Sequence, residues 1–171
     1  MSLDKLLQQL ESCQHAPTEK WDPPYCGEIP LCIKANGDWE YQNSKIERPR
    51  LVKLFASVLV REQQDYYLVT PAEKVKIQVE DAPFIVTEWR QLEVAGQPAI
   101  EVATNIGERY ILSARTPLVV EKGVPYVCLP RGMTAKVHRN VYYQWAELAQ
   151  HAPNNEFVIH SAGQAFTLGQ A

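Results

Sequence analysis

The run Pro30-Leu31-Cys32-Ile33-Lys34-Ala35-Asn36-Gly37 begins a pattern that the chain repeats later. The second copy reads Pro125-Tyr126-Val127-Cys128-Leu129-Pro130-Arg131-Gly132. Each copy leads into apolar residues at helical spacing, and then into a short apolar run at 67–69 or 157–159. Residues 51–76 align with 141–166 without a gap. Few positions are identical, so the repeat is one of pattern, and it predicts two related halves.

The repeat also predicts how the chain is divided. We expect an N-terminal helix and the first half in residues 1–83, and a β-meander and the second half in residues 84–171. The two parts either pack closely as separate domains or form one compact unit. A groove between related halves is the default place for a binding site.

Hydrophobic periodicity predicts three helices and many short strands. The helices are expected at 3–12, from Pro49 to about residue 62, and at 139–151. The strands are expected at 29–34, 39–41, 66–70, 75–80, 84–94, 99–104, 108–113, 118–121, 156–160 and 165–168. Helices and strands come in separate runs, which favours an α+β fold in which each half is an antiparallel sheet with one packed helix. Phe55 and Trp145 occupy aligned positions and should be deeply buried.

Composition and charge exclude several classes of partner. The formal net charge of −3 gives no basic face for nucleic acid. No apolar run approaches the roughly 20 residues that span a membrane. The start of the chain has no basic region followed by an apolar run and a cleavage site, so we expect a cytoplasmic protein. The four cysteines lack metal-type spacing and are expected to be reduced thiols.

No catalytic, cofactor or metal motif is present in the sequence. The four histidines are not paired at the spacing of a zinc site. Gly37 and Gly132 are single turn glycines, not part of a phosphate-binding loop, and there is no Gly-x-Ser-x-Gly elbow. We therefore expect no cofactor, no metal and no catalytic residues, which favours a protein that is not an enzyme.

Several motifs of the chain resemble those of a known family. They are Trp21-Asp22-Pro23-Pro24, Gly27-Glu28-Ile29, Gly37-Asp38-Trp39, Ile46-Glu47-Arg48-Pro49, Leu68-Val69-Thr70-Pro71, Glu73-Lys74 and Val79-Glu80-Asp81-Ala82-Pro83-Phe84. With them, residues 21–149 resemble a bacterial family known as domain of unknown function 1285. The resemblance implies an α+β fold with repeated motifs, no established activity and a suspected part in signal transduction. Cys26 and Cys32 depart from the family pattern.

Polar residues of these motifs are the candidate ligand-binding residues. Thr70, Glu73 and Lys74 lie in an expected strand-end loop, where a plain turn is the alternative. Asp81 either joins the site or caps an Asx-type turn. Arg48 precedes the first turn of a helix, where a cation opposes the helix dipole, so it either pairs with a carboxylate or binds an anion.

The tryptophans Trp21 and Trp39 complete the candidate site, with packing as their alternative role. An anionic or zwitterionic ligand would suit Arg48 and Lys74, with Glu73 or Asp81 orienting the cations or holding an amine. The second copy has His138, Gly163 and Gln164 at the positions of Arg48, Glu73 and Lys74, so it lacks these charges.

Three functions remain open. The first is a cytosolic, non-catalytic binding or adaptor protein with a small ligand or peptide between its halves. The second is an enzyme of unrecognised type that uses polar residues at the strand ends of the first half. The third is an interaction module that buries exposed strand edges against a protein partner. The lack of catalytic signatures favours the first.

Overall fold

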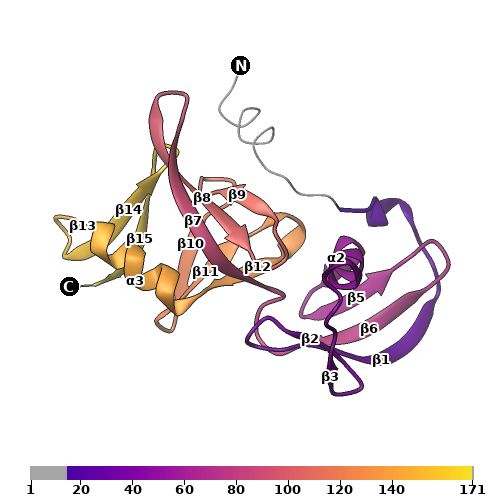
Figure 1. Ribbon diagram of the computed structural model, residues 1–171. Coiled ribbons are helices and arrows are strands. Elements are labelled where there is room, and N and C mark those ends of the chain that lie inside the picture. The colour runs from indigo at the N-terminus through magenta and orange to yellow at the C-terminus, as the bar shows by residue number, and fades with distance from the viewer. Residues whose placement is uncertain (1–14, 171) are drawn as a thin grey trace. The chain divides into compact units, whose positions relative to one another are not determined.

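The computed structural model describes residues 15–170, which form two units (Figure 1). The first unit contains residues 15–83 together with Arg131–Met133. The second unit contains residues 84–130 and 134–170. The helix expected at residues 3–12 lies outside the described residues. No helix within residues 15–170 is both long and apolar enough to cross a membrane.

The first unit is a six-stranded sheet with one α-helix. Its elements are η1 (Thr18–Lys20), β1 (Tyr25–Ile33), β2 (Trp39–Tyr41), β3 (Ser44–Lys45), α2 (Pro49–Ser57), β4 (Leu59–Glu62), β5 (Asp65–Val69) and β6 (Lys74–Val79). The strand order is β3-β2-β1-β6-β5-β4. The neighbours β1 and β6 are parallel, and all the other neighbours are antiparallel.

The second unit has a six-stranded sheet, a three-stranded sheet and one α-helix. Its elements are β7 (Phe84–Val94), β8 (Gln97–Thr104), β9 (Arg109–Ile111), β10 (Leu118–Glu121), β11 (Val124–Cys128), β12 (Thr134–Val137), α3 (Arg139–Leu148), β13 (Gln150–His151), β14 (Glu156–Ser161) and β15 (Gln164–Gln170). The short segment η2 (Pro130–Gly132) follows β11, and its last two residues belong to the first unit. The strand orders are β10-β11-β12-β7-β8-β9 and β13-β14-β15. Again one pair, β7 and β12, is parallel.

The sheets are therefore mixed, and the expectation of antiparallel sheets is wrong for β1–β6 and β7–β12. Parallel neighbours need a crossover connection. Here four strands and α2 lie between β1 and β6, and four strands lie between β7 and β12. Local periodicity marks a strand but carries no information on its direction, which explains the error.

The two halves share an order of elements. In the first half a strand pair, β1 and β2, is followed by α2 and the meander β4-β5-β6. In the second half β11 and β12 are followed by α3 and the meander β13-β14-β15. The last three strands of the two halves pair differently. In the first half β6 pairs with β1, so β4-β5-β6 belongs to the six-stranded sheet, whereas β13-β14-β15 forms a separate sheet. The expected repeat is thus present in the order of elements, and the pairing of strands differs.

Helix α2 is shorter than expected. It ends at Ser57, and Leu59–Glu62 forms β4, which pairs with β5 through Val60 and Tyr67. The run Val58-Leu59-Val60 is apolar and partly β-branched, so its periodicity does not distinguish helix from strand. Leu54, next to Phe55 on α2, is 60% exposed.

Each unit has a buried core that meets its helix through aromatic rings. In the first unit, Trp39 is buried and stacks on the half-buried ring of Phe55, with centroids 6.3 Å apart. In the second unit, Trp145 is fully buried and meets Trp89 edge to face at 6.2 Å. The predicted deep burial is therefore confirmed for Trp145 and wrong for Phe55.

A buried serine connects the two sheets of the second unit. The Ser161 hydroxyl on β14 donates to the carbonyl of Leu112 at 2.6 Å and accepts from the N–H of Ile100 on β8 at 2.8 Å. Both hydrogen-bonding functions of the hydroxyl are used, so the burial of Ser161 leaves no polar group without a partner.

Candidate functional site

A cleft of about 350 Å³ lies in the first unit beside the edge strand β4. One wall is the lead-in segment, which we define as residues 15–24, ahead of β1. The other wall contains all four residues of β4, together with Val69 at the end of β5 and Lys74 at the start of β6. Arg131, from the short segment that belongs to this unit, completes the lining.

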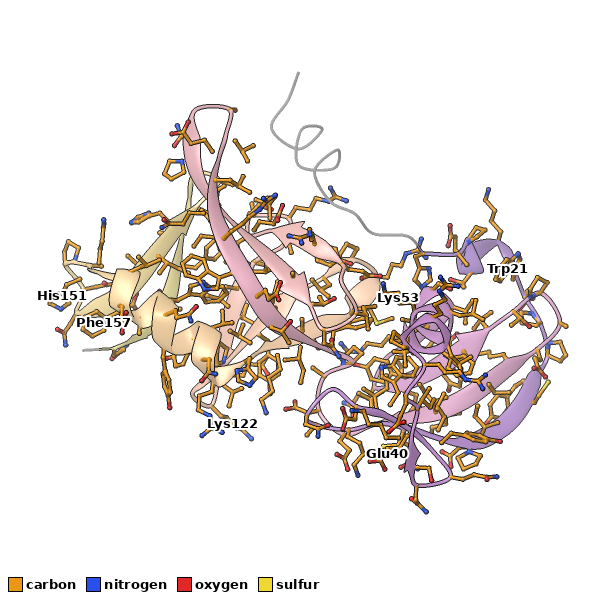
Figure 2. All side chains as sticks on the ribbon, viewed as in Figure 1. Trp21, Glu40, Lys53, Lys122, His151 and Phe157 are labelled. Atoms are coloured by element: carbon orange, nitrogen blue, oxygen red, sulfur yellow. The ribbon has the colours of Figure 1, made fainter. Side chains whose placement is uncertain are left out.

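The lead-in segment is held on the sheet at both ends. The N–H of Ala16 donates to the carbonyl of Ser57 at 2.9 Å. The ring nitrogens of His15 lie 2.7 Å from the carbonyl oxygen of Ala16 and 2.8 Å from that of Leu59. At the other end, the N–H of Lys74 donates to the carbonyl of Pro24 at 3.1 Å. These bonds fix the wall that carries Trp21, which follows η1 (Figure 2).

Lys74 is positioned by two neighbours. Its Nζ lies 2.6 Å from Oε1 of Glu62 on β4 and 4.4 Å from the ring centroid of Tyr67 on β5. The cation–π contact and the ion pair both favour one placement of the ammonium group. The half-buried Lys74 thus presents an oriented charge at the wall of the cleft.

Arg61 of β4 is held by carbonyl groups and an aromatic ring. Its Nε donates to the carbonyl of Gln63 at 2.7 Å, and Nη1 donates to the carbonyl of Gly132 at 2.7 Å. The guanidinium carbon lies 5.7 Å from the ring centroid of Tyr66. Within residues 15–170 no carboxylate pairs with Arg61, so its positive charge is not balanced locally.

The lead-in segment supplies two carboxylates to the cleft. Glu19 lies 3.0 Å from Arg131, and a main-chain hydrogen bond followed by the Arg131 side chain lowers the pKa of Glu19. Asp22 lines the same cleft and is exposed, and the described part of the chain gives it no cation partner. The cleft therefore offers one unbalanced anion, one unbalanced cation and two internal ion pairs.

Of the candidate residues predicted from sequence, Trp21 and Lys74 line the cleft. Thr70 serves the β5–β6 turn, because its hydroxyl accepts from the N–H groups of Ala72 at 3.3 Å and Glu73 at 3.1 Å. Glu73 is exposed in this turn and does not line the cleft.

The remaining candidates lie elsewhere in the first unit. Arg48 is the exposed N-cap residue of α2, with no side-chain capping hydrogen bond. Asp81 is exposed after the end of β6. Trp39 is buried in the core against Phe55, where it has no access to a ligand. None of these three lines the cleft beside β4.

Sequence reasoning missed most of the cleft. Arg61 and Glu62 were expected on a helix, so their place on an edge strand was not foreseen. Asp22 stands in the quoted motif Trp21-Asp22-Pro23-Pro24, and that motif is the signal that could have identified it. Within residues 15–170 no group of three or more histidine, cysteine or acidic side chains is placed to hold a metal ion.

A second cleft of about 520 Å³ lies in the first unit, lined by β1, β6 and the β2–β3 turn. Nζ of Lys34 and Oε2 of Glu80 are 2.8 Å apart, and Glu80 also accepts from the N–H of Ala35 at 2.9 Å. These two hydrogen bonds lower the pKa of Glu80. Burial raises the pKa of the Cys32 thiol, which makes it a poor nucleophile near neutral pH.

Comparisons with known proteins point to one family. The model described as "Domain of unknown function (DUF1285), N-terminal domain" matches residues 16–82, and the one described as "Protein of unknown function (DUF1285), C-terminal domain" matches residues 83–168. A crystal structure of a DUF1285 family protein from Silicibacter pomeroyi has a TM-score of 0.84 and 31% sequence identity, covering 99% of this chain and 96% of that chain.

A second crystal structure, of a DUF1285 family protein from Shewanella baltica, has a TM-score of 0.59 and 30% identity. The match covers 70% of this chain and 91% of that chain. No curated protein matches the chain. These similarities show the family and the fold, and neither similar protein is named for an activity.

Proposed function

This chain belongs to the DUF1285 family, and from the cleft beside β4 we propose that it is a non-catalytic binding protein for a small zwitterionic or peptide ligand. The observation that carries the proposal is the pairing of an apolar floor, formed by Leu59, Val60 and Val69, with charges of both signs around it. Ligand sites are commonly concave and apolar, with a few polar groups that fix the orientation of the ligand.

The charges of the cleft support a ligand that carries both an amine and an acid. Asp22 has no cation partner within the described residues and is available to an amine. Lys74 is already oriented by Glu62 and Tyr67, so binding an acid there costs little side-chain entropy. This proposal places the site within the first unit, where the sequence alone suggested a groove between the halves.

The compartment and the wider role belong to the same proposal. Cys26, Cys32 and Cys128 are free thiols, which is the state expected in a reducing cytoplasm. A part in signal transduction would follow if binding at the cleft changed how the protein meets a partner.

A pair of matched double variants tests the binding site. The variant Lys74→Met/Glu62→Gln removes an ion pair of the cleft, and Lys34→Met/Glu80→Gln removes a similar pair of the second cleft. Free amino acids, dipeptides and tripeptides are screened for an increase in melting temperature, since a ligand that binds only the folded state stabilises it. We expect hits with the wild type and with Lys34→Met/Glu80→Gln that are lost in Lys74→Met/Glu62→Gln.

Two results would contradict this assignment. Hits that stabilise both double variants equally would move the site away from the cleft beside β4. A screen that stabilises neither the wild type nor the control variant would remove the support for this ligand class.

A further inference from the structure

The cleft runs along a strand that has a neighbour on one side only. β4 is last in the order β3-β2-β1-β6-β5-β4, so its outer side has no strand partner within the described residues. Edge strands of this kind accept an extended segment as an additional strand, with main-chain hydrogen bonds supplying the affinity.

The register of β4 shows which residues turn their main-chain groups outward. The N–H of Val69 donates to the carbonyl of Val58 at 3.0 Å, so this pair is hydrogen-bonded across β4 and β5. Antiparallel pairs alternate between hydrogen-bonded and non-hydrogen-bonded, which makes Val60–Tyr67 the next bonded pair. Leu59 and Arg61 therefore direct their N–H and C=O groups away from β5, toward the outer side of the sheet.

The lead-in segment contacts β4 only at its first residue, through the His15 side chain, and its main chain bonds to the end of α2. Ser57 O accepts from Ala16, and Leu59 O accepts from the His15 ring. Within residues 15–170 no hydrogen bond outside the β4–β5 ladder is recorded to the main-chain N–H or C=O of Arg61, and Arg61 lines the cleft with the rest of β4. An outward N–H and C=O on one residue are what a neighbouring strand needs to exchange two hydrogen bonds.

Resting on the proposed function, we propose that the occupant of the cleft is an extended peptide that pairs with the outer edge of β4 at Arg61 and carries a basic side chain for Asp22. The peptide continues the edge from the point where the lead-in segment leaves it. Trp21 and Val60 supply apolar surface for the neighbouring side chains of the peptide. Asp22, which lacks a cation partner, selects lysine or arginine over an acidic residue.

The test uses the full-length protein and capped heptapeptide libraries with either lysine or glutamate fixed at the centre. A fluorescence polarisation screen selects the tightest peptide, and a copy with an N-methyl group on the central amide is then compared. We expect lysine peptides to be selected, and N-methylation to weaken binding about tenfold, since it removes one main-chain hydrogen bond.

Two variants of one residue separate the main chain of Arg61 from its side chain. Arg61→Ala keeps the outward N–H, whereas Arg61→Pro removes it, and an edge strand tolerates proline where the N–H faces outward. We expect Arg61→Pro to weaken the selected peptide at least tenfold relative to Arg61→Ala. In the wild type, amide hydrogen exchange at Arg61 should slow when the peptide binds, a measurement that does not depend on how the variants fold.

The outcomes separate strand pairing from the binding site itself. If the selected peptide loses affinity in Lys74→Met/Glu62→Gln but exchange at Arg61 does not change, the cleft binds the peptide and strand addition is wrong. If no heptapeptide of either library binds, strand pairing with a peptide is wrong. The melting-temperature screen then still tests whether the cleft binds small zwitterionic ligands. Concentration-dependent dimers that Arg61→Pro abolishes would also overturn it, because the edge would then pair with a second copy of the chain.

Discussion

Glu101 on β8 shows how one buried charge is held in the second unit. Its carboxylate lies 2.8 Å from Nε of Arg90 on β7 and 3.0 Å from Nη1 of Arg109 on β9. The Glu101 side chain is only 6% exposed, whereas those of Arg90 and Arg109 are 64% and 47% exposed. The desolvation cost therefore arises mainly at the Glu101 carboxylate, and the attraction of the two arginines offsets it.

This asymmetry predicts unequal effects of removing the two sides of the cluster. Glu101→Gln leaves two arginines that water solvates, so it should cost about 1 kcal/mol of unfolding free energy. Arg90→Gln/Arg109→Gln leaves a buried carboxylate without a cation and should cost about 3 kcal/mol. Urea denaturation at neutral pH measures both. Equal losses, or a larger loss for Glu101→Gln, would show that the arginines do not compensate the buried charge.

At the scale of elements, α2 and α3 occupy the same place in the repeated order but are buried to different degrees. Trp145 at the centre of α3 is fully buried, and its Nε1 has no hydrogen-bond partner in the described structure. Phe55, at the aligned position of α2, is half-buried and stacks on Trp39. α3 is therefore the more tightly integrated helix, and the energetic cost of truncation should follow burial.

We expect Trp145→Ala to lower the free energy of unfolding by roughly 3–5 kcal/mol, because it leaves a large cavity. Phe55→Ala should cost less, about 1–2 kcal/mol, since much of the ring is already in contact with water. Trp145→Phe is the control: it keeps most of the volume and removes the unpartnered N–H, so its loss should be about 1 kcal/mol. Guanidinium titrations followed by circular dichroism rank the three, and a larger loss for Phe55→Ala would reverse this interpretation.

At the scale of the whole molecule, each of the two units has its own buried core. Leu31, Ile33 and Ile77 belong to the first core, and Val86, Val102 and Trp145 belong to the second. The sheets do not continue from one unit into the other, since each strand order stays within one unit. Separate cores are the physical condition for separate unfolding.

Hydrogen exchange with Trp145→Ala tests this separation. Amides of β7, β8 and β14, in the unit that contains Trp145, should exchange faster than in the wild type. Amides of β1, β5 and β6, in the other unit, should keep their wild-type rates. Faster exchange throughout would mean that both units unfold in one cooperative step.

Periodicity is a local property of the sequence, so it predicted where most of the helices and strands lie. β7 has the predicted limits, α3 was placed correctly at its start, and the repeated order of elements follows from the aligned patterns. The family was likewise recognisable from short motifs that need no tertiary information. Of the candidate site, Trp21 and Lys74 were named, because both stand in those motifs.

Strand direction and the position of the cleft depend on contacts between distant segments, and the end of α2 coincides with the start of the β4–β5 hairpin. Whether β1 and β6 run parallel depends on a pairing between distant segments. Leu59–Glu62 becomes an edge strand by pairing with β5, the next strand along the chain, and its apolar periodicity does not distinguish that strand from a helix. Arg61 and Asp22 meet at one cleft because the lead-in segment is tied to that edge by His15 and Ala16. The sequence separation of Arg61 and Asp22 does not predict that both line the cleft, because hydrogen bonds between distant segments bring them there.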